Sequence, residues 1–193
     1  MFFNKLERKS DEDLMQGIQH GDRQAMTVLY RRYAPLLLRY FYRMLWKEQT
    51  TAQDFLQDVF VKIIDRPESF KSGSRFSTWI YSIAHNMCKN EYRKRAFRKT
   101  ESDYTVDVSS DHDTHAHLAA DEFKAALDKE LNRLDEDDKN IFVLRYELDL
   151  PVAEIALMTN EAEGTVKSKL FYIRKKLAKQ LVVFQTDTLY GKN

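Results

Sequence analysis

Residues that break helices are scarce in this chain. Only five glycines and three prolines occur among 193 residues, whereas leucine, lysine, glutamate, glutamine and arginine are plentiful. Straight-chain residues lose little side-chain freedom in a helix, and glycine and proline interrupt helices most strongly. The composition therefore predicts an all-α protein, and 43% apolar residues are enough to form buried cores.

Cysteine is almost absent, and long apolar runs are absent altogether. The single cysteine, Cys88, excludes an internal disulfide framework and any cysteine-rich zinc module. No apolar run approaches the ~18 residues that a membrane-spanning helix needs. The charged residues that follow Met1 come too early for a secretory signal. Together these absences predict a cytoplasmic protein.

The net charge is also small, at +1, but the charges are unevenly distributed. Residues 1–100 hold 19 Lys and Arg against 11 Asp and Glu, residues 101–160 hold 5 against 16, and residues 161–193 hold 7 against 3. Such an alternation is typical of two parts that face a polyanion and are joined by an acidic connection. Charge blocks also occur on ordinary solvated faces, so the motifs have to decide between these interpretations.

Residues 1–99 are predicted to form a first domain of four helices. Ser10, Asp22 and Thr51 stand where a polar side chain can cap the start of a helix. A short polar loop at 66–75 precedes a long fourth helix, in which Trp79 shares the apolar face and is interpreted as a core residue. The far end of that helix is strongly basic, with Lys89, Arg93, Lys94, Arg95, Arg98 and Lys99.

Residues 100–121 are predicted to be an acidic, flexible linker. Seven acidic residues and no lysine or arginine occur over 101–122, and self-repulsion keeps such a stretch extended. His112, His115 and His117 have a spacing that could ligate a metal, but no scaffold surrounds them. We therefore predict no metal site.

Residues 122–184 are predicted to form a second helical domain, followed by a C-terminal tail at 185–193. Its first half has apolar residues at helical spacing, namely Phe123, Leu127, Leu131, Leu134, Ile141, Leu144 and Leu148. In its second half, Ala156 allows two helices to cross closely, Asn160 tolerates the left-handed backbone of a tight turn, and Val166 packs the last helix back. This arrangement predicts a helix-turn-helix, although an ordinary three-helix bundle with a solvated basic face explains the spacing equally well.

The stretch Glu154-Ile155-Ala156, followed by Glu163-Gly164-Thr165-Val166-Lys167-Ser168-Lys169-Leu170, resembles region 4 of extracytoplasmic-function sigma factors. In that family, region 4 binds the −35 promoter element. The resemblance, together with the predicted outer face of the last helix, implies DNA contacts by Thr165, Lys167, Ser168, Phe171, Tyr172 and Lys175. The chain departs from the family at Asp149 and Asn160, where glycine is common, at Ala162, which has no capping oxygen, and at Tyr172, where arginine is frequent.

The segment Phe70-Lys71-Ser72-Gly73-Ser74-Arg75-Phe76-Ser77-Thr78-Trp79 and its continuation to Asn86 resemble region 2 of the same family, which opens the −10 element. Stacking and a polar pocket can recover the cost of holding a base outside the duplex. The residues predicted to capture the −10 strand are Phe70, Lys71, Ser72, Gly73, Ser74 and Arg75, with phosphate contacts from Lys89, Arg93, Lys94 and Arg98.

Residues 52–60 resemble the preceding region 2 helix, which grips the clamp coiled coil of the polymerase β′ subunit. Asp54, Gln57 and Asp58 are the predicted polar contacts. The ordered set of motifs implies a promoter-specificity factor that binds core RNA polymerase through the β′ clamp and the β flap, reads promoter DNA and is held by an anti-sigma factor. It implies no cofactor and no catalysis.

Two other functions are open to the residues alone. One is a free-standing helix-turn-helix regulator that binds duplex DNA, but it leaves the basic helix and the polar loop of the first domain unexplained. The other is a nucleic-acid enzyme, which the sequence disfavours because it has no glycine-rich phosphate loop, zinc signature or nucleophile–base pair.

Overall fold

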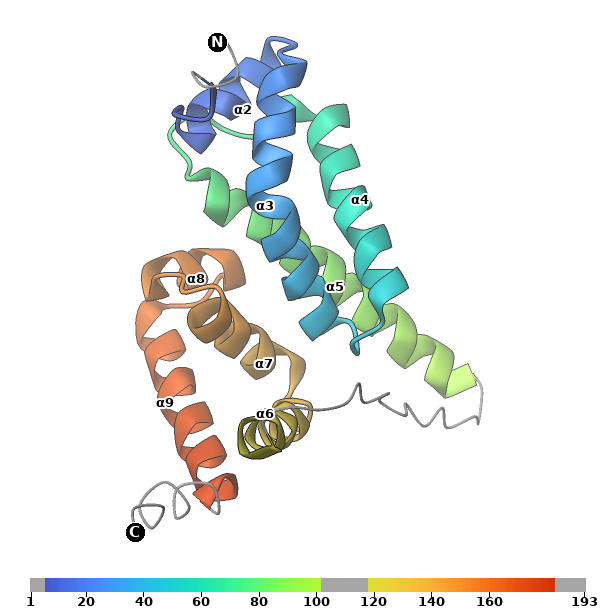
Figure 1. The fold of residues 1–193 in the computed structure, drawn as a ribbon, viewed down its shortest axis with the longest axis vertical. Coiled ribbons are helices and arrows are strands. Elements are labelled where there is room, and N and C mark those ends of the chain that lie inside the picture. The colour runs from blue at the N-terminus through green and yellow to red at the C-terminus, as the bar shows by residue number, and fades with distance from the viewer. Residues whose placement is uncertain (1–5, 102–117, 183–193) are drawn as a thin grey trace.

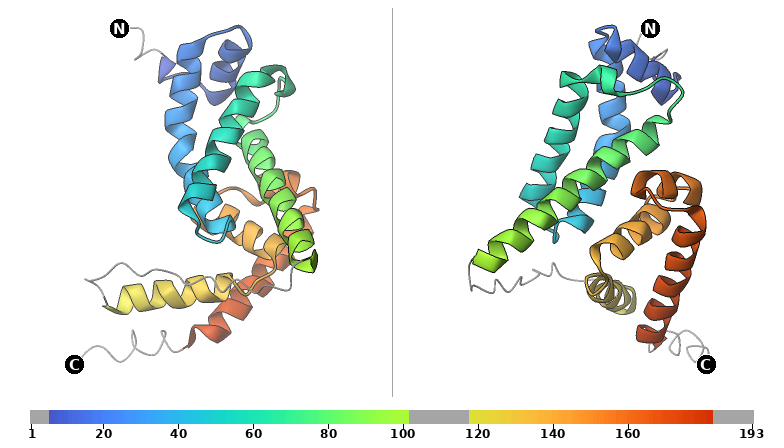
Figure 2. Two further views of the ribbon diagram at one scale, coloured as in Figure 1. Left: turned by 90° about the vertical axis from the view of Figure 1, so that its right-hand side faces the viewer. Right: turned by 180° about the vertical axis from the view of Figure 1, so that it is seen from behind.

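The structure, a computed structural model, describes residues 6–101 and 118–182, which form two groups of helices (Figure 1 and Figure 2). The first unit contains α2 (Asp11–Gln19), α3 (Arg23–Met44), α4 (Gln49–Asp65), a short 3-10 turn (Pro67–Ser69) and α5 (Phe76–Glu101). The second contains α6 (Leu118–Leu131), α7 (Glu136–Phe142), a π-helical turn (Val143–Glu147), α8 (Val152–Thr159) and α9 (Glu163–Gln180). These ranges contain no strand, and the all-α prediction is confirmed.

Helices α5 and α6 reach the two edges of the segment predicted to be the linker. Helix α5 ends at Glu101 and α6 begins at Leu118. The three histidines of the possible metal site lie between them, outside the described residues. Within the described part of the chain, no cluster of His, Cys, Asp and Glu could hold a metal ion. None of the described helices is long and apolar enough to cross a bilayer.

Two of the three predicted helix starts are confirmed. The Ser10 hydroxyl accepts a hydrogen bond from the Asp13 N–H at 3.0 Å, and the Asp22 carboxylate accepts one from the Gln24 N–H at 2.9 Å. The prediction for Thr51 is wrong, because α4 already begins after Glu48. The Thr51 hydroxyl instead lies in the first turn and donates to the Glu48 side chain at 3.0 Å.

The core of the first unit is aromatic and aliphatic and is shared by α2, α3, α4 and α5. Its fully buried side chains include Leu14, Leu29, Leu37, Tyr40, Phe41, Ile63, Phe76 and Ile80. Trp79 is partly buried against this cluster, with its ring centroid 5.7 Å from that of Phe76, so its assignment to the core is confirmed. This packing fixes the start of α5, where the polar loop joins it.

A separate cluster holds the far end of the second unit together. It consists of Leu131, Leu134, Phe142, Ile173, Leu177 and Leu181. Phe123 was expected in this apolar stripe but is 42% exposed. Among the described side chains of α6, those that pack against this cluster are Ala126, Leu127 and Leu131, so Phe123 lies beyond the cluster's edge.

Two non-glycine residues of the second unit adopt the left-handed backbone conformation. Asp149 has φ 54° before α8, and Asn160 has φ 56° and ψ 42° at the end of α8. Asn and Asp visit this region at lower cost than other side chains. Both positions are those at which the resembling family commonly has glycine, so the two departures preserve the backbone geometry.

Candidate nucleic-acid interface

The loop between α4 and α5 is exposed but held in place from beneath. Its residues Lys71 to Arg75 are all exposed, and Gly73 has φ +84°, a conformation that favours glycine. Phe70 is only 3% exposed, and its ring packs 5.3 Å from the ring of Trp79. The aromatic ring therefore anchors one end of the loop in the core, while the polar residues remain accessible.

Two residues of α2, Gln19 and Glu12, hold this loop in place, and neither could be predicted from local sequence patterns. The Gln19 side-chain amide donates to the backbone carbonyls of Pro67 and Phe70, at 2.9 and 3.0 Å. The Glu12 carboxylate accepts the backbone N–H of Phe76 at 2.9 Å and so caps the start of α5. The bonded residues are 48, 51 and 64 positions apart in the sequence, so only the fold brings them together.

The basic part of α5 offers several cations, and two of them interact within the unit: Arg98 pairs with Glu91 at 3.3 Å, and Arg95 packs on the turn before α4. Arg93, Lys94 and Arg98 are exposed, and Lys89 is partly buried. Arg95 instead lies over the Trp46 ring, 3.8 Å from its centroid, and pairs with Glu48. Four predicted phosphate contacts are thus presented on the helix, whereas Arg95 joins α5 to the turn before α4.

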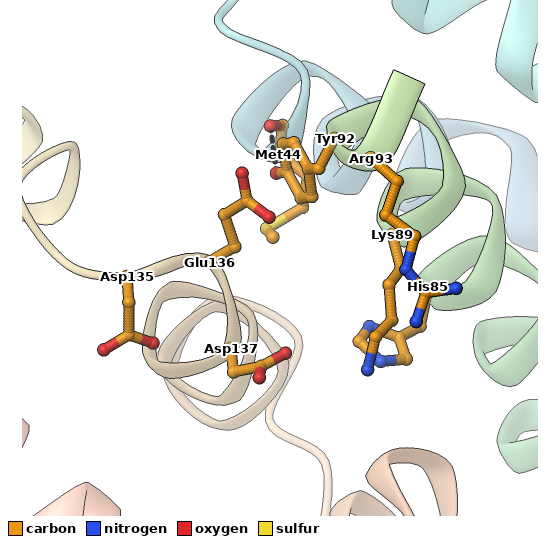
Figure 3. A pocket seen from close by; sticks show the side chains of 8 residues that line it. All are labelled: Met44, His85, Lys89, Tyr92, Arg93, Asp135, Glu136 and Asp137. Carbon is orange, nitrogen blue, oxygen red and sulfur yellow. Dashed lines mark hydrogen bonds between the residues drawn. The ribbon is translucent and has the colours of Figure 1, made fainter. Parts of the chain in front are cut away.

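Lys89 and Arg93 line a cleft of about 430 Å³ between the two units (Figure 3). His85, Tyr92 and Met44 complete its first wall, and the opposite wall is acidic, formed by Asp135, Glu136 and Asp137 at the start of α7. Burial and the nearby Lys89 lower the pKa of His85, so this imidazole is neutral at pH 7. Burial and the neighbouring Asp137 raise the pKa of Glu136.

Helix α4 presents a mixed polar and apolar face. Asp54, Gln57 and Asp58 are exposed on it, as expected for residues off the apolar stripe. Val61, at helical spacing from Asp54 and Gln57, is 50% exposed on the same face. An exposed apolar side chain beside polar residues suits a protein-binding surface, and Val61 is a member of this face that was not singled out from the sequence.

Helices α8 and α9 form the predicted helix-turn-helix. Ile155, Ala156 and Met158 of α8 are buried, as are Val166 and Leu170 of α9. Asn160 makes the left-handed turn, and the Glu161 N–H donates to the Ala156 carbonyl at 3.0 Å. Ala162 precedes α9 without a side-chain cap, as predicted.

The outer face of α9 carries all six residues predicted to meet the −35 element, and every one of them is exposed. They are Thr165, Lys167, Ser168, Phe171, Tyr172 and Lys175. The rings of Phe171 and Tyr172 are 59% and 66% exposed and lie 5.4 Å apart. An apolar pair beside lysines on one helix face suits a major groove, where methyl groups and phosphates are both within reach.

Comparison with known proteins gives consistent matches. The family model "Sigma-70 region 2" matches residues 29–98, and "Sigma-70, region 4" matches residues 124–177. The chain is 30% identical over 186 residues to the RNA polymerase sigma-H factor of Pseudomonas aeruginosa, covering 91% of this chain and 96% of that one. It is 29% identical over 189 residues to the ECF RNA polymerase sigma-E factor of Haemophilus influenzae, covering 91% and 97%.

Among solved structures, the fold resembles the sigma factor RpoE in complex with the anti-sigma factor NepR from Bartonella quintana. The TM-score is 0.67 at 23% identity, over 80% of this chain and 94% of that one. It also resembles CnrH in complex with the cytosolic domain of CnrY, with a TM-score of 0.69 at 20% identity over 91% and 99%.

Proposed function

This chain belongs to the sigma-70 family of RNA polymerase initiation factors, in its extracytoplasmic-function group, and we propose a division of labour between its surfaces on that premise. The family's role is promoter-specific transcription initiation, and its members are not enzymes. The proposal concerns which residues perform each part of that role, with residues 1–99 as region 2, 100–121 as linker, 122–184 as region 4 and 185–193 as tail.

Region 4 reads the −35 element with the outer face of α9. The observation that supports this is the exposure of Thr165, Lys167, Ser168 and the Phe171–Tyr172 pair on one side of a helix whose other side is buried. Lysine and serine can bond phosphates or base edges, and the rings can contact thymine methyl groups. Lys175 lies on the same face and can contact the phosphate backbone of the DNA.

Region 2 captures the melted −10 strand with its exposed loop. Lys71, Ser72, Gly73, Ser74 and Arg75 supply a cationic, donor-rich rim without bulky side chains at its centre, and Phe70 supports the rim from the core. A flipped base needs such a polar edge close to aromatic residues. The phosphate contacts come from Lys89, Arg93, Lys94 and Arg98 on α5.

Helix α4 binds the polymerase. Its face of Asp54, Gln57, Asp58 and Val61 offers carboxylates around an exposed apolar side chain, as a docking surface for the basic and apolar residues of a partner would. The partner we propose is the β′ clamp coiled coil, with the β flap contacting region 4. We also propose that an anti-sigma factor covers these surfaces and that the protein is located in the cytoplasm.

The decisive experiment is transcription in vitro by core polymerase and this protein on a randomised promoter library. Enrichment of a −35 and a −10 sequence at fixed spacing supports the proposal. With one selected promoter, K167A/S168A should lower initiation only when the −35 element is intact. Lys124, an exposed residue of α6 in the same unit, provides the control K124A.

The two loop cations are tested on the same promoter. K71A/R75A should block open-complex formation, followed by base reactivity to permanganate, while binding to core polymerase is unchanged. R23A, which removes an exposed arginine at the start of α3, is the control. Loss of core binding in both K167A/S168A and K71A/R75A would contradict the proposed division of labour, as would tight binding to duplex DNA without polymerase.

A further inference from the structure

Gly164 lies in the first turn of α9, and neither its backbone nor its surroundings in the protein require a glycine. Its φ is outside the left-handed region, unlike those of Gly21 and Gly73. A Cβ at this position would have no heavy atom of the described structure within 4 Å, its chain neighbours and the helix's own backbone aside. A Cβ at Gly17, by contrast, would lie 3.4 Å from that of Ala25. Internal packing therefore does not account for Gly164.

The glycine also weakens the helix in which it lies. Glycine loses more backbone freedom on folding than alanine does, so it is a poorer helix former. The same helix begins without a side-chain cap at Ala162, which removes a second source of stability from its first turn. An alanine at position 164 would fit the free protein and would favour the helix. Any benefit of the missing side chain therefore lies outside the free protein.

Gly164 stands on the face of α9 that we assign to the −35 element. Lys167, Ser168 and Phe171 follow it three, four and seven positions later, a spacing that places residues on one side of a helix, and all four are exposed. Side chains of a helix lean toward its N-terminus, so those of Lys167 and Ser168 point back toward the surface above Gly164. The glycine thus leaves a gap on the proposed DNA face, directly beside two residues that read it.

The dimensions of the major groove give such a gap a use. An α-helix with its side chains is about 10–12 Å across, whereas the groove is about 12 Å wide and 8.5 Å deep. In a helix-turn-helix, the N-terminal residues of the second helix contact the base edges. At that end of α9, a side chain that points into the groove without bonding a base would hold the helix away from the bases. Bare backbone removes this obstacle.

We propose that Gly164 is the point at which α9 comes closest to the −35 duplex, and that its missing side chain sets how deeply the helix enters the major groove. At this depth Lys167 and Ser168 reach base edges and Phe171 reaches thymine methyl groups. A side chain at position 164 moves all three outward together, so recognition of the bases is lost. This inference rests on the proposed function of α9.

Two substitutions of increasing size test the role of Gly164. G164A adds one carbon and G164L adds a full side chain, and both residues favour a helix more than glycine does. A162S is the matched control, because a serine there can cap the same helix start without adding an atom to the DNA face. G164A and A162S should each raise the midpoint of thermal unfolding by about 1–4 °C. A weaker interaction of G164A with DNA would then not result from poorer folding.

The readout is the affinity of core polymerase carrying each full-length variant for two promoters, one with an intact and one with a scrambled −35 element. The ratio of the two affinities measures recognition of the element. G164A should lower this ratio about five- to tenfold, as loss of recognition at one base pair does. G164L should bring the ratio close to one, whereas A162S should keep that of the parent. Affinity for the scrambled promoter should be the same in all of these proteins.

Separate results would overturn the inference and the proposed function. If K167A/S168A lowers the ratio but G164A and G164L keep it, the role of Gly164 is refuted while the function of α9 stands. Equal losses in G164A and G164L, or an equal loss in A162S, would attribute the effect to the rigidity of the helix start rather than to space in the groove. A lower unfolding midpoint for G164A would show that the glycine serves the fold. If K167A/S168A and G164L both keep the ratio, the −35 assignment of α9 is itself refuted.

Discussion

Lys139 is the most unusual charge among the described residues, because it is buried at the edge of the contact between the two units. It is 9% exposed, and its ammonium donates to the Asn132 side chain at 2.9 Å. Burial, Arg43 and Lys47 lower its pKa to about 8, while Asp128 and Glu147 act in the opposite direction. The folded protein therefore disfavours the charged form of this lysine.

Stability should depend on pH through Lys139. Between the folded pKa of about 8 and the ordinary value near 10.5, the unfolded chain binds a proton that the folded one has released, so the free energy of unfolding rises with pH in this window. Below pH 8 the lysine is protonated in both states, so the full free-energy cost of burying its charge is present. K139M should stabilise the protein at pH 7 by about 1–3 kcal/mol.

The measurement for Lys139 is urea unfolding of the parent and K139M at pH 7 and pH 10. The difference between the two proteins is the informative quantity, because buried tyrosines and Cys88 titrate in both. The advantage of K139M should shrink toward zero at pH 10. An advantage that stays constant with pH would attribute it to packing rather than to charge.

The backbone conformation of Asn160 allows a second prediction about a single residue. Its φ of 56° closes the turn between α8 and α9, and a Cβ-bearing residue without a local hydrogen-bonding side chain is strained there. N160A should cost about 1 kcal/mol of unfolding free energy, whereas N160G should be neutral or slightly stabilising. Thermal unfolding followed by circular dichroism distinguishes them, and equal losses in both variants would show that the side chain matters more than the backbone.

At the scale of the elements, the helices and their faces follow from local sequence. Ser10 and Asp22 predicted their helix starts because a capping bond spans only two or three residues. The exposed face of α9 followed from the spacing of Val166, Leu170 and Ile173 alone. The exposure of Phe123 could not be predicted in this way. The spacing of apolar residues indicates which side of α6 is apolar, but not how far along the helix the cluster that it packs against extends.

Helix α9 has a start that can be improved without altering its DNA face. Ala162 precedes it with extended backbone angles, φ −71° and ψ 145°, but its side chain cannot accept a bond from the free N–H groups of the first turn. A162S should raise the free energy of unfolding by about 0.5–1 kcal/mol. Denaturant unfolding measures this change, with A178S on the exposed side near the far end of α9 as control, and equal effects would refute the capping argument.

For the whole molecule, the sequence motifs predicted the family and the proposed DNA surfaces, but not how the two units meet. The loop, α4 and α9 each form a proposed surface from residues that are close together in the sequence, so these residues could be named from spacing and resemblance. Glu154 belonged to a quoted motif, yet its partners Arg75, Ser77 and Thr78 are 76 to 79 positions away. A contact at such a separation depends on the arrangement of the domains, which local periodicity does not encode.

The contact between the two units makes a prediction through Tyr40 of α3 and Asn140 of α7, two almost fully buried residues. The Tyr40 hydroxyl donates to the Asn140 side-chain oxygen at 2.7 Å, and Y40F would leave that buried oxygen without this donor. Y40F should therefore lower the free energy of unfolding by about 1–2 kcal/mol, whereas Y42F, at the 38% exposed Tyr42 on the same helix, should change it little. Denaturant unfolding of both variants decides the matter. If the units were separated in the folded protein, Asn140 would be hydrated before and after the substitution, and Y40F would unfold like Y42F.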